Sequence, residues 1–207
     1  MKIAILTLPL HTNYGGILQA YALQTVLERM GHEVTVITRD KRVPITARLL
    51  FLSIPKRILS NLCGKQNGVF REFRWNHTYK RISKNVSPFI DKYIKQDNRF
   101  LEEIKPTDYD VIVVGSDQIW RPKYIHNTLR SSVKNAYLDF AKFWSIGRIA
   151  YAASFGTDEW EYSTEETDLI KPLLGKFNSV SVRELSGITL CREFLDTTAE
   201  IVLDPTL

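Results

Sequence analysis

The first forty residues contain two short aliphatic runs separated by a long and mostly apolar segment. Each run lacks polar alternation, which is typical of a strand covered on both faces in a parallel sheet. The segment between them has few polar residues and stops at a glycine, so it predicts a buried helix. The unit consists of a strand at Lys2–Leu8, a turn at Pro9–Gly16, a helix at Ile17–Met30 and a strand at Glu33–Thr38. With a right-handed crossover, it predicts an α/β fold with a doubly wound, mostly parallel, Rossmann-like sheet.

Strand and helix patterns alternate along the rest of the chain. Asp110–Gly115 is a second clear buried strand that ends in glycine. Further strands are predicted at Phe89–Ile94, Arg148–Ser154, Ser179–Arg183 and Glu200–Leu203, and further helices at Arg48–Leu62, Val69–Arg81, Asn98–Ile104, Thr164–Phe177 and Leu185–Leu195. No repeat or glycine-rich linker divides the sequence. We therefore expect residues 1–207 to be a single Rossmann-like N-terminal domain that ends near an interdomain linker, with the C-terminal domain absent.

The composition excludes several classes of protein. An apolar fraction of 44% is enough for a full core, and no apolar run approaches the roughly 20 residues of a membrane span. Without a signal-like N-terminus, the chain is expected to be cytoplasmic. Cys63 and Cys191 lie in no metal or redox spacing, and the four histidines never fall three or four residues apart. No metal site is predicted.

Residues 39–95 are strongly basic. They hold 14 Lys and Arg against 3 Asp and Glu, a net of +11 in a chain whose total is +5. Such a segment is either a solvated basic face or a surface that attracts polyanions or anionic lipid. Four aromatic side chains interleave with the bases as in single-strand nucleic-acid binders, but their spacing suits a helix packed on the sheet, so no nucleic-acid partner is predicted. These are Phe70, Phe73, Trp75 and Tyr79.

Ligands of open parallel sheets bind beyond the carboxyl ends of the strands, where three segments carry polar residues. The first, His11-Thr12-Asn13-Tyr14-Gly15-Gly16, has an imidazole, side-chain donors and two glycines at a helix start. It predicts a phosphate or carboxylate site, although an ordinary strand-to-helix turn has the same composition. The sequence has neither GxGxxG nor GxxxxGK[ST], which disfavours nicotinamide, flavin and P-loop enzymes.

The second segment follows the strand that ends at Gly115. Asp117 is placed to deprotonate or orient a sugar hydroxyl, Gln118 to bond a neighbouring hydroxyl, and Trp120 to stack on a sugar ring. In the alternative interpretation, Ser116 or Asp117 caps a helix and Trp120 belongs to the core.

The third segment comprises two strand ends, at Ser154 and at Arg183. A guanidinium at that edge suits a phosphate or a carboxylate, because its planar fork donates two parallel hydrogen bonds. A structural ion pair of Arg183 with Glu184 or Asp204 is the alternative.

Five stretches together resemble the N-terminal half of the polysaccharide pyruvyl transferase family: ILTLPLHTNYGGILQAYALQTVLERMGHEVTVI, DVIVVGSDQIW, YAASFG, SVRE and VLDPTL. The resemblance implies a two-domain architecture similar to GT-B glycosyltransferases, with the active site in the interdomain cleft. It also implies that Arg183 reaches the donor, while the acceptor side is lined by Asn13, Tyr14, Gly15, Ser116, Asp117, Gln118 and Trp120. The resemblance further implies a C-terminal half, in which the family carries a functional histidine and further basic residues, and this half is expected to lie outside residues 1–207.

The implied reaction transfers a pyruvyl group from phosphoenolpyruvate to sugar hydroxyls as a ketal in surface polysaccharide biosynthesis. The donor is a substrate, and no cofactor is expected. Because it carries about three negative charges, its binding requires cationic groups. Asp117 is then the expected base or acceptor anchor, Arg183 a clamp, and His11 a reserve acid or phosphate donor.

The resemblance also suggests partners, since such glycans are assembled on polyprenyl-phosphate carriers at the inner membrane face. Arg42, Arg48, Lys56 and Arg57 flank the apolar run Leu49–Leu52, a pattern suited to peripheral contact with anionic lipid. Two other functions stay open: a GT-B glycosyltransferase that uses a nucleotide sugar, and a non-catalytic half-domain that binds a glycan or a partner chain.

Overall fold

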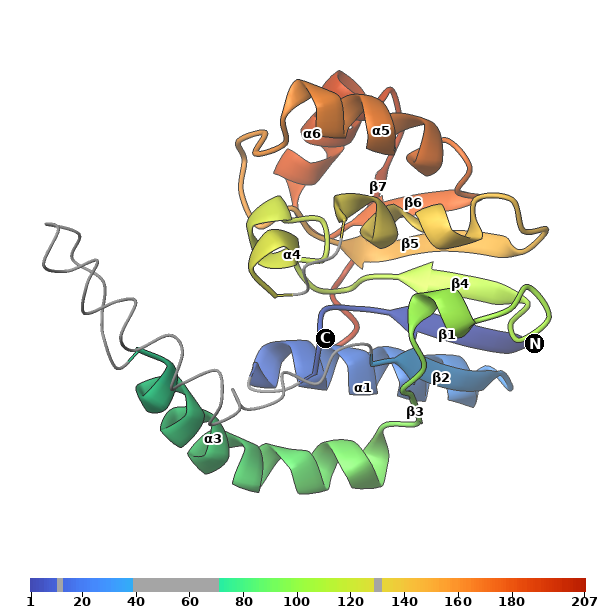
Figure 1. Ribbon diagram of the computed structural model, residues 1–207. Coiled ribbons are helices and arrows are strands. Elements are labelled where there is room, and N and C mark those ends of the chain that lie inside the picture. The colour runs from blue at the N-terminus through green and yellow to red at the C-terminus, as the bar shows by residue number, and fades with distance from the viewer. Residues whose placement is uncertain (11–12, 39–70, 129–131) are drawn as a thin grey trace, which may run out of the picture.

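The computed structural model describes residues 1–10, 13–38, 71–128 and 132–207 of the chain. Its centre is one seven-stranded sheet in which every pairing is parallel, in the order β3-β2-β1-β4-β5-β6-β7 (Figure 1). The strands are β1 (Lys2–Leu6), β2 (Glu33–Ile37), β3 (Gln96–Asp97), β4 (Val111–Val114), β5 (Gly147–Ala153), β6 (Ser179–Val182) and β7 (Glu200–Ile201). The α-helices are α1 (Tyr14–Arg29), α3 (Arg71–Tyr93), α4 (Pro122–Thr128), α5 (Thr164–Leu174) and α6 (Leu185–Leu195), and the 3₁₀ helices are η1 (Leu101–Glu103), η2 (Val133–Tyr137) and η3 (Asp139–Ala141). The predicted α/β, Rossmann-like fold is confirmed.

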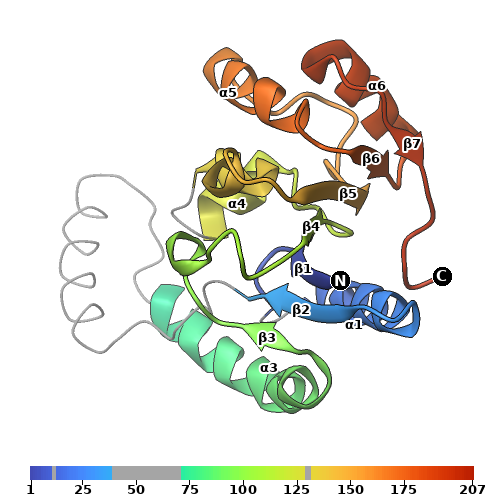
Figure 2. The ribbon, with the colours of Figure 1, turned by 90° about the vertical axis from the view of Figure 1, so that its right-hand side faces the viewer.

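Helices cover both faces of the sheet, as the aliphatic strands require. Successive side chains of a strand point to opposite faces, and in β1 Ile3 and Ile5 belong to one core while Ala4 and Leu6 belong to the other. The first core is completed by α1 and α3, and the second by α4, α5, α6 and the 3₁₀ helices between them. Figure 2 shows α1 and α3 together on one side of the strands.

The segment before β3 differs from its predicted structure. Phe89–Ile94 is predicted as a strand, but Phe89–Tyr93 forms the last turn of α3. The helical spacing explains the difference: Ile90 is buried against the sheet, and the rings of Phe89 and Tyr93 both contact Tyr21 of α1, at 5.4 and 5.9 Å between centroids. Asn98–Ile104 contains one 3₁₀ turn where a helix is predicted, and the predicted helix Arg48–Leu62 lies outside the described residues.

The strand order creates one topological switch point. From β1 the chain adds β2 and β3 on one side, whereas from β4 it adds β5, β6 and β7 on the other. β1 continues into α1 on one face, and β4 continues toward α4 on the opposite face. The loops therefore diverge between the carboxyl ends of β1 and β4, which is where sheets of this type bind ligands.

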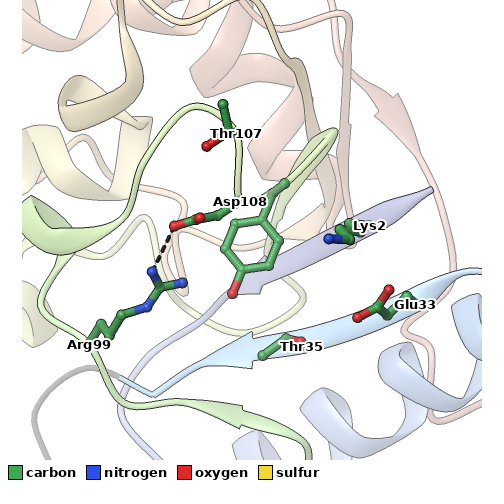
Figure 3. A pocket seen from close by; sticks show the side chains of 7 residues that line it. Lys2, Glu33, Thr35, Arg99, Thr107 and Asp108 are labelled. Atoms are coloured by element: carbon green, nitrogen blue, oxygen red, sulfur yellow. Dashed lines mark hydrogen bonds and ion pairs between the residues drawn. The ribbon is translucent and has the colours of Figure 1, made fainter.

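A polar pocket of ≈220 Å³ lies near the opposite ends of the strands, by the amino ends of β1 and β2 (Figure 3). Its wall is an ionic cluster in which Arg99 bonds both Asp97 and Asp108 at 2.7 Å, and the Tyr109 hydroxyl donates to Asp97 at 2.7 Å. The pocket contains none of the predicted site residues. It is lined by Lys2, Glu33, Thr35, Arg99, Thr107, Asp108 and Tyr109.

The ionic cluster gives a prediction about acid stability. Burial alone would raise the pKa of Asp97, but hydrogen bonds from Arg99 and Tyr109 outweigh it and lower the pKa to about 2. Ionised Asp97 therefore stabilises the fold above pH 4, and this stabilisation disappears as the pH falls toward 2. We expect Asp97→Asn to lower the free energy of unfolding at pH 6 by about 1–2 kcal/mol, after allowance for the partly exposed Arg99.

Urea unfolding of both proteins between pH 6 and pH 2 measures this difference. The difference in the free energy of unfolding between the wild type and Asp97→Asn should become small near pH 2. Asp168→Asn, at an exposed position of α5, is the control for loss of a carboxylate as such. A difference that persists unchanged down to pH 2 would contradict the assignment.

Candidate functional site

The segments that follow β1 and β4 meet at the switch point. The Thr7 hydroxyl donates to Oδ2 of Asp117 at 2.7 Å, and the backbone N–H of Leu8 donates to the same oxygen at 3.0 Å. The first turn of α1 lies close by, because a Cβ on Gly16 would be 3.9 Å from this oxygen. The turn after β1 and the loop after β4 thus share one edge of the sheet, as their positions at strand ends predict.

Asp117 is held inside the protein, and only 4% of its surface is exposed. Burial raises the pKa of its carboxyl group, and the hydrogen bonds from Thr7 and Leu8 and the positive charge of Arg183 oppose this effect only in part. Its second oxygen, Oδ1, is buried and has no hydrogen-bond partner in the described part of the chain. The carboxyl group therefore faces the end of β1.

The residues on either side of Asp117 also carry oxygens without partners. Ser116 is 1% exposed, and its hydroxyl and the side-chain oxygen of Gln118 make no hydrogen bond to any described residue. Gly156 lies against Gln118: its φ is +67°, and a Cβ there would be 2.5 Å from the carboxamide. A buried oxygen without a donor costs about 1–3 kcal/mol, so this loop favours a ligand that donates hydrogen bonds.

The amino end of α1 forms the other side of the site. Asn13 is the N-cap residue, but its side chain makes no capping hydrogen bond, and the first turn holds no acidic residue. The first backbone N–H groups of a helix have no partner inside the helix and carry its positive dipole end. Gly15 is exposed, Gly16 is buried next to the Asn13 carboxamide, and Tyr14 is 57% exposed.

Trp120 belongs to the core. Its indole is fully buried, stacks on Tyr137 with 5.3 Å between centroids and an interplanar angle of 6°, and donates to the carbonyl of Ala136 at 3.3 Å. The stacking on a sugar ring predicted for Trp120 has no support in this geometry, because neither face of the indole reaches the surface. The core position of Trp120 agrees with the alternative interpretation, but the side chains of Ser116 and Asp117 cap none of the described helices. The exposed aromatic next to the site is Tyr14.

Arg183 makes both of the ion pairs that the sequence left open. Its Nη1 donates to Asp204 at 3.1 Å and to the carbonyl of Ser116 at 3.1 Å, and its Nε lies 3.3 Å from Glu184. Gln19 of α1 also donates to Asp204. One guanidinium is thus shared by two carboxylates, and this part of the edge carries no excess positive charge.

The family model described as polysaccharide pyruvyl transferase matches residues 13–207, a range that contains α1, the loop after β4 and six of the seven strands, while β1, Thr7 and Leu8 lie before it. The chain belongs to the polysaccharide pyruvyl transferase family. This is a family of transferases, which agrees with the resemblance seen in the sequence. No individually curated protein matches the chain.

Two residues of this candidate site, Thr7 and Gln19, are not evident from the sequence. Thr7 is a polar residue at the end of an aliphatic run, which indicates a functional role only weakly. Gln19 is one of several polar residues on a helix, and nothing in the sequence distinguishes it from the others. Ser154 is fully buried, donates to Glu184 and accepts from the N–H of Gly156 at 3.0 Å. Asp204, at the third position after β7, joins α1 to Arg183.

Three expectations from the sequence concern features other than the contacts at the switch point: the role of His11, a metal site and a membrane-spanning helix. His11 lies outside the described residues. Within the described ranges, no three His, Cys, Asp or Glu side chains are arranged to hold a metal ion. Among the helices of those ranges, none combines the length and apolarity needed to cross a bilayer.

Proposed function

We propose that the chain contributes to the transfer of a pyruvyl group from phosphoenolpyruvate to sugar hydroxyls, with the switch-point edge as the acceptor side. The contact between the Asp117 loop and the end of β1 carries this proposal, because it places the partnerless side-chain oxygens of Ser116 and Gln118, which flank Asp117, beside an uncapped helix end. The oxygens suit the hydroxyl groups of a sugar, and the exposed Tyr14 ring suits its apolar face.

The charges of this edge favour a neutral acceptor over the anionic donor. Arg183 is already balanced by Asp204 and Glu184, so close to three further negative charges would be uncompensated there. In this proposal Arg183 clamps the donor only if its guanidinium is released from one carboxylate. His11 remains the proposed acid or phosphate donor, and further cations lie outside the described edge.

The proposed reaction has four steps. A proton adds to C3 of phosphoenolpyruvate, and the oxygen of a first sugar hydroxyl forms a bond to C2 and releases its proton. The C2–O bond to phosphate then breaks, and the phosphate leaves with one proton. A second hydroxyl bonds to C2 and loses its proton, which closes the ketal. The two protons released by the hydroxyl groups balance the proton added at C3 and the proton that leaves with the phosphate. The enzyme therefore needs an acid and a base but no redox cofactor.

The first expected result is phosphate release that requires both phosphoenolpyruvate and a glycan. The protein is incubated with phosphoenolpyruvate and a panel of candidate glycans, phosphate is followed continuously, and the glycans are analysed by mass spectrometry for a ketal-linked pyruvate. Sugar transfer from a nucleotide sugar without phosphate release would support the glycosyltransferase alternative. Glycan binding without turnover would support the non-catalytic alternative.

We also propose a lipid-linked acceptor and peripheral contact with anionic membrane at the inner membrane face. The charge of the basic segment supports this, with a net of +11 over residues 39–95. Its residues Arg42, Arg48, Lys56 and Arg57 lie outside the described residues. Flotation with vesicles tests the contact, and equal binding to neutral and anionic vesicles would contradict it.

A further inference from the structure

We propose that Asp117 is a positioning residue, whose carboxyl group clamps the end of β1 and the start of α1 against β4 and does not take the proton of the substrate. This inference rests on the proposed pyruvyl transfer for its kinetic part. Its structural part, the clamp, stands on the geometry alone.

The side chain of Asp117 joins two segments that are 110 residues apart in sequence. A single oxygen, Oδ2, receives the Thr7 hydroxyl at 2.7 Å and the Leu8 N–H at 3.0 Å. Leu8 is the second residue after β1, and the chain enters α1 six residues later. The position of this carboxyl group therefore fixes where the turn before α1 begins.

The backbone of Asp117 is tied to the opposite neighbour of β4. Its carbonyl accepts the N–H of Ser154 at 3.0 Å, and three residues further on the N–H of Trp120 donates to the Ser154 carbonyl at 3.2 Å. The loop before Asp117 is tied to β1, because Gly115 donates to the carbonyl of Leu6 at 3.1 Å. Asp117 thus stands on a loop that is hydrogen-bonded to both neighbours of β4, and its side chain holds Thr7 and Leu8 after the end of β1.

A catalytic base has to reach the proton that it removes, within about 3 Å or through one water. Oδ2 of Asp117 is occupied by two protein donors, and Oδ1 is buried beneath the surface. Both observations fit a group that accepts hydrogen bonds from Thr7 and Leu8 and remains inside.

Three variants separate positioning from proton transfer. Asp117→Asn keeps an oxygen for Thr7 and Leu8 but cannot act as a base, Asp117→Ala removes the clamp, and Thr7→Val removes one donor while the carboxyl group stays. If the clamp is the function, Asp117→Asn keeps kcat/KM within about threefold of the wild type and has the same pH profile. Asp117→Ala then loses about a hundredfold, and Thr7→Val about tenfold, since a misplaced turn displaces the acceptor.

The clamp has a readout that does not depend on activity. Amide hydrogen exchange of peptides spanning the end of β1 and the first turn of α1 should accelerate in Asp117→Ala and Thr7→Val and stay unchanged in Asp117→Asn. If Asp117→Ala does not fold, the other two variants carry the test. A wild type without pyruvyl transfer would reject the proposed function, while the exchange pattern would still decide the clamp.

One pattern of results would overturn the inference. If Asp117 is the base, Asp117→Asn should lose about 10²- to 10⁴-fold in kcat/KM, with a changed pH profile and unchanged exchange. Equal exchange in all three variants would likewise reject the clamp.

Discussion

Replacement of Gly115 with alanine is expected to abolish the folded protein. Gly115 has φ at +123°, a region that side-chain-bearing residues rarely adopt, and a Cβ at this position would be 2.2 Å from the carbonyl oxygen of Tyr151. Tyr151 lies in β5, in the irregular stretch between Ala150 and Ala153, and both of these residues pair with β6, so a shift of the Tyr151 carbonyl would disturb this pairing. We expect a loss of about 4 kcal/mol or more, most of the stability of a typical domain, seen as loss of soluble protein and of the cooperative urea transition.

Gly31→Ala is the matched control for this substitution. Gly31 also has a positive φ, +87°, but a Cβ there would meet no atom within 4 Å. The cost should be only the backbone strain of a left-handed alanine, about 1–2 kcal/mol. Similar losses for the two variants would show that backbone strain alone matters and that the contact with Tyr151 is unimportant.

The buried strands could be predicted from the sequence because each is covered on two faces. β1 and β4 are continuous aliphatic runs, and their ends lie within two residues of the predicted ones. The same rule gives no information about β3, which consists of two residues at the edge of the sheet and has no periodic pattern. The aromatic and aliphatic content of Phe89–Ile94 predicts a strand, although its aromatic rings contact Tyr21 of α1.

The location of the site could be predicted, but not the contacts within it. Polar segments after strand ends meet at one edge of a parallel sheet, and this places the Tyr14 turn near the Gln118 loop. Whether Arg183 faces a ligand or a carboxylate depends on side-chain positions that no local pattern encodes. The pairing of Thr7 with Asp117 depends on β1 and β4 being neighbours, which is a property of the complete strand order.

The two aromatic residues of the candidate site should respond to substitution in opposite ways. Trp120→Ala should lower the free energy of unfolding by about 3–5 kcal/mol, because it removes a fully buried ring, its stacking on Tyr137 and its hydrogen bond to the Ala136 carbonyl. Tyr14→Ala, at an exposed ring, should change stability by less than about 0.5 kcal/mol. Urea unfolding of the two variants beside the wild type measures both effects.

The acceptor kinetics of the same variants then decide which ring meets the sugar. If Tyr14 is the platform, Tyr14→Ala raises KM for the glycan about tenfold and leaves KM for phosphoenolpyruvate unchanged, whereas Tyr14→Phe, which keeps the ring, behaves like the wild type. Trp120→Phe keeps part of the packing and should be folded enough to assay, with an unchanged KM for the glycan. The reverse pattern, a glycan effect in Trp120→Phe and none in Tyr14→Ala, would require the indole to leave the core, where it lies between Tyr137 and Phe155. Since no substrate-sized group can reach a ring packed in this way, we expect the effect on acceptor binding to belong to Tyr14 alone.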